Sequence, residues 1–134
     1  MGNKSSNPYF GLVAEKEMSY AGTKFANQNP YYETHGLKII PCSLTVEYGD
    51  KSTKLTKNSM ILLEILIMDP TIIHSRENIC NILSDCASPL SENALNQCVH
   101  RLKEKLKELL DEELIDTERG VGYRWKYEVK CFYR

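Results

Sequence analysis

Amide, imidazole and cationic side chains recur at helical spacing between residues 92 and 110, and a binding surface can be built from such groups. If this segment is a helix turning about 100° per residue, its apolar residues fall within about 60° of one direction. Amides on the opposite side can form two hydrogen bonds with the edge of a base in the major groove of DNA. The candidates for base recognition are Asn93, Asn96, Gln97 and His100.

Basic side chains flank this polar side of the predicted helix. Lys103 and Lys107 lie on one flank, and Arg101 and Lys105 lie on the other. Cations in these positions can bind phosphates on both sides of the groove while the amides contact the bases. The pattern is typical of a DNA recognition helix, but the solvated side of an ordinary amphipathic helix has a similar composition. The helix alone leaves both interpretations open.

The next segment, residues 115–127, contains two alternating runs separated by Arg119, Gly120 and Gly122. This pattern predicts a β-hairpin in which both glycines supply the positive φ angles of a tight turn. Arg119 then lies at the tip, where its guanidinium can enter a narrow minor groove of negative potential. Arg124 on the second strand is the other minor-groove candidate. A hairpin beside the predicted helix favours DNA binding.

The formal net charge of −1 gives no global indication of a nucleic-acid partner, because many such domains are clearly basic. The charges are nevertheless segregated along the chain. Residues 100–107 are mostly basic and residues 111–118 are mostly acidic, so a local basic stripe remains available to phosphates. The low charge, together with Glu104 on the polar side of the helix, leaves one alternative: a protein-interaction module that does not bind DNA.

The sequence indicates neither an enzyme nor a metal site. It contains no Gly-rich phosphate loop, no H-E-x-x-H and no G-x-S-x-G motif, and His74 is expected to be a strand or capping residue. The five cysteines form no C-x-x-C pair, and their odd number argues against a complete disulfide framework. We expect them to be small buried hydrophobic residues of a cytoplasmic protein that needs no metal or cofactor.

Three helices must position these candidates, and apolar spacing predicts them at residues 57–68, 76–84 and 92–110. Thr56 and Ser75 are suitable N-caps for the first two helices. The first helix is apolar nearly all round, which is the composition of a helix surrounded by other elements. We therefore expect it at the centre of the core.

Short strands separated by turn residues precede the helices and predict a small N-terminal antiparallel sheet. The expected fold class is therefore α+β. We expect one domain at residues 23–128, after a flexible N-terminal arm at residues 1–22 and before a C-terminal tail at residues 129–134. The expected strands are Tyr31–Tyr32, Leu37–Ile40, Leu44–Tyr48 and Lys54–Leu55.

The order of these elements and four short motifs resemble the winged-helix output domain of the OmpR/PhoB family of response regulators. The similarity covers about residues 37–127. The closing motif is specific, and the other three occur in the expected order and spacing. The motifs are Leu55-Thr56-Lys57-Asn58-Ser59 with Leu62-Leu63, Ser75-Arg76-Glu77, Val99-His100-Arg101-Leu102-Lys103, and Thr117-Glu118-Arg119-Gly120-Val121-Gly122-Tyr123-Arg124.

The resemblance implies a winged helix-turn-helix with a four-stranded N-terminal sheet, three helices and a C-terminal hairpin wing. It implies a sequence-specific transcription regulator, with its third helix in the major groove and its hairpin tip in the minor groove of double-stranded DNA. It also implies direct-repeat sites, side-by-side homodimers on DNA, and contact between the loop at 85–91 and RNA polymerase. The chain departs from the family pattern at Ser84-Asp85, which replaces Trp-Gly, and at Asn96 and Cys98, which replace an acidic residue and a histidine.

Within the family, the N-terminal placement of the domain is most similar to that of ToxR-like and CadC-like regulators. Met18-Ser19 and Gly22-Thr23-Lys24-Phe25 resemble the run that opens the ToxR domain. Regulators of this branch carry the domain in the cytoplasm, ahead of a membrane helix. If this chain is the cytoplasmic part of such a protein, its sequence continues past Arg134 into a stretch of about 20 apolar residues.

Overall fold

The computed structural model describes residues 29–86 and 91–133. The arm expected at residues 1–22 lies outside the described residues, as does the middle of the loop at 85–91. The described part contains two antiparallel sheets and three α-helices. The expected α+β class is therefore confirmed.

The first sheet has five strands in the order β4-β3-β2-β1-β8, each antiparallel to its neighbours. The first three strands expected near the N-terminus form, whereas the fourth, expected at Lys54–Leu55, runs from Lys51 to Lys54 and excludes Leu55. The short 3-10 helix η3 (Pro41–Ser43) joins β2 to β3. The strands are β1 (Pro30–Thr34), β2 (Leu37–Ile40), β3 (Thr45–Tyr48), β4 (Lys51–Lys54) and β8 (Lys130–Tyr133).

Strand β8 forms from the segment that the sequence assigned to a C-terminal tail. It pairs with β1, with Cys131 opposite Tyr32 and Tyr133 opposite Pro30. The expectation of four strands and a free tail was therefore wrong by one strand. The segment Lys130-Cys131-Phe132-Tyr133 does not alternate polar and apolar residues, so it lacks the pattern that identifies a half-buried strand in a sequence, and all four residues are exposed.

The helices lie within two residues of their predicted bounds. Each begins at a hydroxyl N-cap, which satisfies a backbone N–H that has no partner inside the helix. The cap oxygens of Thr56, Ser75 and Ser91 accept from the N–H three residues ahead at 3.0 or 3.1 Å, and only the last of these caps was not predicted. The helices are α2 (Lys57–Met68), α3 (Arg76–Cys86) and α4 (Glu92–Leu109).

Helix α2 is the centre of the core, as its composition predicted. Every residue from Ser59 to Ile67 is buried, including Glu64. Helices α3 and α4 and strand β7 (Gly122–Trp125) all pack against α2. A helix enclosed in this way serves as the common support of these three elements.

The second sheet forms the wing. It consists of β5 (His74–Ser75), β7 and β6 (Ile115–Glu118) in the order β5-β7-β6, so the predicted hairpin is confirmed. His74 is a buried strand residue, and its Nε2 lies 3.0 Å from the carbonyl oxygen of Asp69.

The two wing glycines have different roles, which the sequence did not separate. Gly120 has a φ of +76° in the turn, as expected. Gly122 does not have a positive φ, so the prediction of a left-handed conformation there was wrong. A Cβ atom at Gly122 would instead collide with the backbone carbonyl of His74. Gly122 therefore allows β5 to approach β7.

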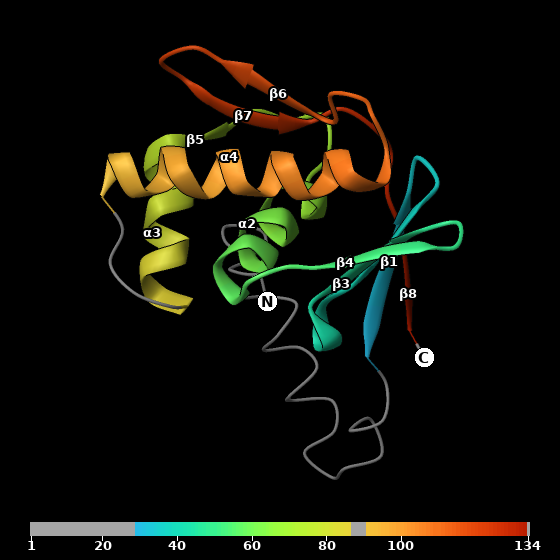
Figure 1. Ribbon diagram of the computed structural model, residues 1–134. Coiled ribbons are helices and arrows are strands. Elements are labelled where there is room, and N and C mark those ends of the chain that lie inside the picture. Colours follow the sequence, from blue (N-terminus) through green and yellow to red (C-terminus); the bar gives the residue numbers. More distant parts are fainter. Residues whose placement is uncertain (1–28, 87–90, 134) are drawn as a thin grey trace, which may run out of the picture.

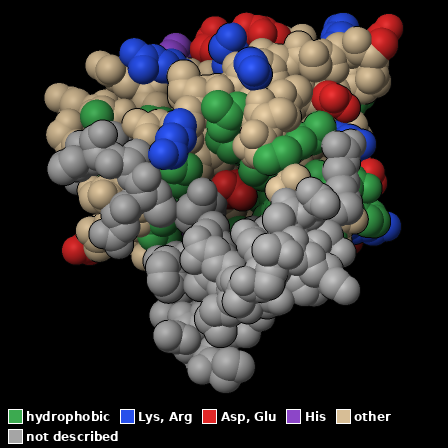
Figure 2. Space-filling model, turned by 90° about the horizontal axis from the view of Figure 1, so that it is seen from below, with side chains coloured by type: hydrophobic (Ala, Val, Ile, Leu, Met, Phe, Trp, Pro, Cys, Tyr) green, Lys and Arg blue, Asp and Glu red, His purple; other side chains and the backbone are tan. Residues whose placement is uncertain are grey.

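Figure 1 shows how these elements expose α4. The helix lies across the molecule, with the wing along one side, α3 near its N-terminal end and the five-stranded sheet near its C-terminal end. Figure 2 shows the molecule from below: hydrophobic side chains show in the middle of this face, and charged side chains gather along its upper rim. The arrangement leaves one long side of α4 uncovered.

Replacing Leu102 with alanine tests the assignment of the buried side of α4. Leu102 is fully buried, so Leu102→Ala should lower the free energy of unfolding by about 2–5 kcal/mol. Urea denaturation would measure the change, with Lys105→Ala at an exposed position of the same helix as control. Equal stability of the two variants would mean that the helix is packed the other way round.

Candidate nucleic-acid interface

The polar side of α4 faces solvent. Asn93, Asn96, Gln97 and His100 are all exposed. Leu95, Cys98, Val99, Leu102, Leu106 and Leu109 on the opposite side are buried. The predicted division of the helix into two sides is therefore correct, and the helix can present amide and imidazole groups to a groove.

Asn96 differs from the other three because its side chain is already bonded within the protein. Arg76 Nη2 donates to Asn96 Oδ1 at 2.8 Å, and the Tyr123 hydroxyl donates to the same oxygen at 3.4 Å. Arg76 Nη1 also donates to the Tyr123 hydroxyl at 2.6 Å. An amide binds adenine bidentately only if it offers both a donor and an acceptor. In this arrangement Asn96 offers only its NH2 group, and it joins α4 to α3 and the wing.

Sequence analysis missed this cluster because its members come from three elements. Arg76 begins α3, Asn96 lies on α4 and Tyr123 lies on β7. The signal available was the position of Arg76 and Tyr123 inside two of the family-like motifs. Neither motif indicates which residue its side chain contacts.

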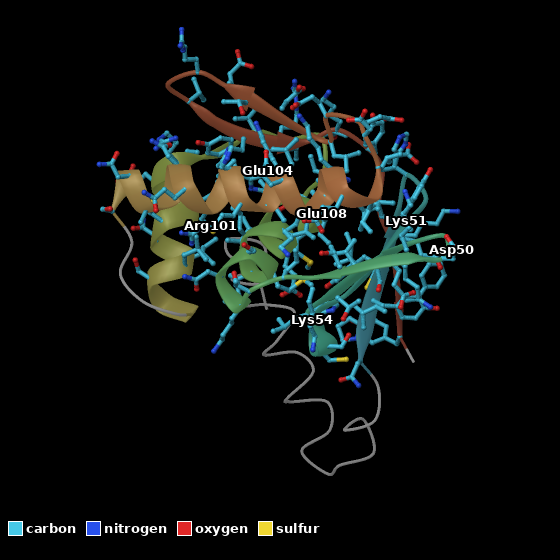
Figure 3. The ribbon with its side chains drawn as sticks, viewed as in Figure 1. Asp50, Lys51, Lys54, Arg101, Glu104 and Glu108 are labelled. Atoms are coloured by element: carbon cyan, nitrogen blue, oxygen red, sulfur yellow. The ribbon has the colours of Figure 1, made fainter. Side chains whose placement is uncertain are left out.

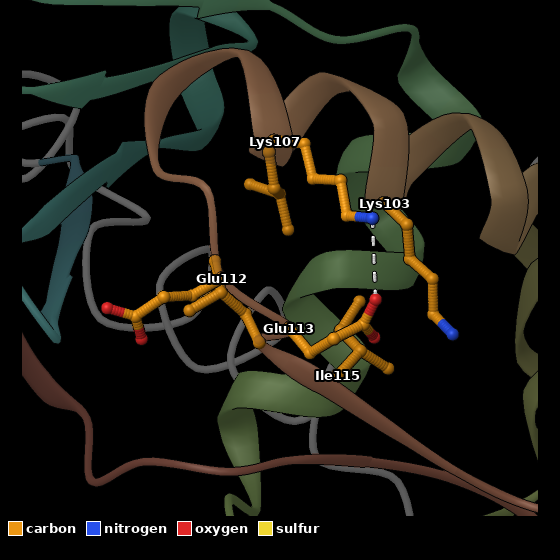
Figure 4. A pocket seen from close by; sticks show the side chains of 7 residues that line it. Lys103, Lys107, Glu112, Glu113 and Ile115 are labelled. Atoms are coloured by element: carbon orange, nitrogen blue, oxygen red, sulfur yellow. Dashed lines mark ion pairs between the residues drawn. The ribbon is translucent and has the colours of Figure 1, made fainter.

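The cations on the wing side of α4 are also engaged. Lys103 Nζ donates to Thr117 Oγ1 on β6 at 2.9 Å. Lys107 Nζ lies 3.5 Å from Glu113 Oε2, beside the small pocket shown in Figure 4. Both lysines were predicted to bind phosphate. The structure shows that they also attach the wing and its preceding loop to α4.

The cations on the flank of α4 away from the wing are open to solvent. Arg101 and Lys105 are exposed, and neither makes an ion pair among residues 29–86 and 91–133. Glu104 lies between them in the sequence and is exposed as well. Figure 3 shows Arg101 on the side of α4 that faces away from the wing.

The two wing arginines are placed differently. Arg119 is exposed in the turn between β6 and β7, as predicted. Arg124 Nη2 instead donates to Asp116 Oδ2 at 2.7 Å, and Lys126 Nζ lies 3.7 Å from the other oxygen of that carboxylate. The hydrogen bond from Arg124 is the main cause of the lowered pKa of Asp116. Asp116 is therefore ionised at neutral pH and holds Arg124 against the hairpin.

The cysteines follow the expected pattern only in part. Cys98 is buried in α4, and burial raises the pKa of its thiol, while a hydrogen bond with Ser59 opposes that shift. Cys98 therefore remains a neutral thiol in the core. Cys42 and Cys131 are exposed, so the expectation of burial was wrong for both. Their exposed turn and edge-strand positions are not visible in the sequence pattern.

These elements together define a class of protein. Helices α3 and α4 form a helix-turn-helix, α2 supports them from behind, and the β6–β7 hairpin lies beside α4. An exposed polar helix next to a hairpin with an arginine at its tip is the architecture of a winged-helix DNA-binding domain.

Comparison with known proteins agrees with this class. The sequence profile of the family described as "Transcriptional regulatory protein, C terminal" matches residues 50–125, which is more than half of the chain. The chain belongs to this family of DNA-binding domains of bacterial transcription regulators, which confirms the resemblance to the OmpR/PhoB type.

Two solved domains and one curated relative illustrate the similarity. The chain is 39% identical over 79 residues to the response regulator protein GraR of Staphylococcus aureus (strain Newman), covering 59% of this chain but only 35% of GraR. The DNA-binding domain of E. coli CadC has the same fold, with a TM-score of 0.71 at 17% identity over 78% of this chain and 99% of that one. The C-terminal domain of NsrR, a lantibiotic response regulator, has a TM-score of 0.63 at 28% identity over 69% and 93%.

Membrane attachment was expected only from a segment beyond this chain. Among the described residues, no helix is both long enough and apolar enough to cross a bilayer. The prediction of a later membrane helix therefore stays a prediction.

The ion pair at Asp116 yields a test of how the wing presents charge. Asp116→Asn removes a carboxylate that repels phosphate and releases Arg124 and Lys126, so affinity for a nonspecific duplex should rise a few-fold at low salt. Fluorescence anisotropy at two salt concentrations would measure the change. Glu33→Gln, on the first sheet, is the matched control. A rise no larger than that of the control would show that this part of the wing does not approach DNA.

Proposed function

We propose that the domain is a sequence-specific transcription regulator that places α4 in the major groove of double-stranded DNA and the β6–β7 wing in the adjacent minor groove. The observation that carries this proposal is the uncovered side of α4, where Asn93, Gln97 and His100 are all exposed. Donor and acceptor groups on one exposed side of a helix suit the edges of bases in a major groove.

The wing supports the same docking. Its turn exposes Arg119, and the hairpin is attached to α4 through the bond between Lys103 and Thr117. This bond holds β6, the strand that leads to Arg119, against α4. A guanidinium at a fixed distance from a major-groove helix can enter the neighbouring minor groove.

The assembly on DNA belongs to the proposal as well. Resemblance to the OmpR/PhoB family supports side-by-side protomers on direct-repeat sites and a contact between the loop at 85–91 and RNA polymerase. One structure similar to this chain at 23% identity is described as the AdeR DNA-binding domain in complex with an intercistronic region. Resemblance to CadC-like regulators supports a cytoplasmic location ahead of a membrane helix.

The alternative is a winged-helix interaction module that does not bind DNA. The exposed Glu104 on α4 and the net charge of −1 favour it. The two hypotheses differ in salt dependence. A DNA-binding domain loses affinity steeply as salt rises and prefers some sequences, whereas an interaction module binds no duplex at any salt concentration.

One experiment decides between them. Binding to a random duplex pool, and to duplexes enriched from it by repeated selection, would be measured over a salt series. Tighter binding to the enriched duplexes supports the proposed function. Binding without enrichment reduces the domain to a nonspecific binder, and no binding favours the interaction module.

Gln97→Ala tests base recognition by α4. Removing the amide should relax sequence preference at one or two base pairs by about 1–3 kcal/mol, with nonspecific affinity little changed. Site selection with the variant and with the parent would measure the preference. Asn96→Ala is the comparison variant, because the Asn96 side-chain oxygen already accepts a hydrogen bond from Arg76 and is not available to a base. An unaltered preference for Gln97→Ala would remove Gln97 from the base-reading residues.

Arg119→Ala tests the wing. An exposed residue adds little to folding, so stability should stay within about half a kcal/mol of the parent. Affinity should fall most on sites whose flanks are A·T-rich, since a narrow minor groove concentrates negative potential. Anisotropy titrations with A·T-rich and G·C-rich flanks would compare the losses. Equal losses would make Arg119 a phosphate contact, and no loss would count against insertion of the wing.

A further inference from the structure

The positive charge around α4 is divided unevenly between its two flanks. On the wing side, Lys103 is bonded to Thr117 and Lys107 is paired with Glu113. On the opposite side, Arg101 and Lys105 are exposed and make no ion pair within the described part of the chain. The α4 cations without a side-chain hydrogen bond or ion pair among the described residues therefore lie on the flank away from the wing.

A groove runs along that flank. It lies between the first turn of α2 and the N-terminal half of α4, and Lys57, Gln97 and Arg101 line it from the two helices. Gln97 is one of the exposed amides proposed to contact bases. A strand of DNA whose bases reach Gln97 therefore has its backbone close to this groove.

Two further cations lie near the groove, beyond the residues that line it. Lys54 is exposed at the end of β4, three residues before Lys57, and Lys105 lies one turn of α4 beyond Arg101. Figure 3 shows Arg101 and Lys54 on the side of the molecule below α4, with Asp50 and Lys51 at the far end of β4.

Two exposed carboxylates lie near the groove and offset part of its positive charge. Glu108 accepts a hydrogen bond from Thr53 Oγ1 at 3.1 Å. Glu104 makes no ion pair in the described residues and is exposed. Four cations stand against these two carboxylates, so an excess of positive charge remains beside α4; the cations are Lys54, Lys57, Arg101 and Lys105.

Lys57 is also badly placed for stability. It is the first residue of α2, and the first turn of that helix contains no acidic residue. A cation at the N-terminal end of a helix opposes the helix dipole, so Lys57 lowers the stability of the free protein. A ligand phosphate in the groove would turn that unfavourable charge into a favourable one.

We propose that this groove binds a backbone phosphate of DNA through Lys57 and Arg101, with Lys54 and Lys105 reaching the neighbouring phosphates. The inference rests on the proposed docking of α4 in the major groove and adds a second anchor on the flank opposite the wing. The DNA backbone is then bound on both sides of the recognition helix, by the wing on one side and by the start of α2 on the other.

A salt series with Lys57→Ala tests the groove. For a nonspecific duplex, the slope of log K against log salt should decrease in magnitude by about 0.9 for the one phosphate contact that is lost. Arg101→Ala should give a similar decrease. The matched control is Lys130→Ala, which removes an exposed lysine from β8 at the opposite edge of the sheet and should leave the slope unchanged.

Lys57→Glu separates binding from folding. An acidic residue in the first turn is favourable to the helix, so the midpoint of thermal unfolding should rise while affinity for duplex falls further than in Lys57→Ala. A structural role for Lys57 would move both quantities in the same direction. If the parent binds duplex and Lys57→Ala binds as Lys130→Ala does, the groove is not a phosphate site. If the parent itself binds no duplex, the proposed function fails and this inference fails with it.

Discussion

The buried Trp125 side chain joins the two halves of the domain. Its indole is fully buried, and Nε1 donates at 2.8 Å to Thr34 Oγ1, which in turn donates at 2.7 Å to the carbonyl oxygen of Glu128. Trp125 ends β7 of the wing, and Thr34 ends β1 of the first sheet. A buried hydrogen-bonding group left without its partner is costly, so this chain of bonds fixes the two sheets in one relative position. The angle at which the wing leaves the core, and with it the position of Arg119, depends on this connection.

Hydrogen bonds at the molecular surface also join α4 to its neighbours. The cluster of Arg76, Asn96 and Tyr123 bonds α4 to α3 and β7, and Lys103 bonds it to β6. Polar side chains on the exposed side of α4 are therefore used to hold this helix and the wing in register. A surface of this kind is preorganised, because binding need not first order the elements that carry the contacts. The remaining exposed groups, among them Gln97 and Arg101, then act from a fixed frame.

Periodic patterns and contacts between distant residues were not equally visible in the sequence. The bounds of α2 and the buried side of α4 followed from apolar spacing, because burial on one side of a helix repeats every three to four residues. Strand β8 does not alternate polar and apolar residues, so no period-two pattern marked it. The bond from Arg76 to Asn96 spans 20 positions, and the pairing of Arg124 with Asp116 depends on the register of the hairpin. The requirement for glycine at position 122 was equally invisible, because it comes from a collision that a Cβ atom there would make with the backbone of His74 on another strand.

The pairing of β8 with β1 places Pro30 opposite Tyr133, so the two ends of the described chain leave the domain at one corner of the first sheet. Figure 1 shows this corner away from α4 and from the tip of the wing. Tension between the two ends would act across the hydrogen bonds of this antiparallel pair and break them one after another, as in opening a zipper, instead of shearing them together. The sheet edge would therefore peel at low force, while α4 would carry little of the load.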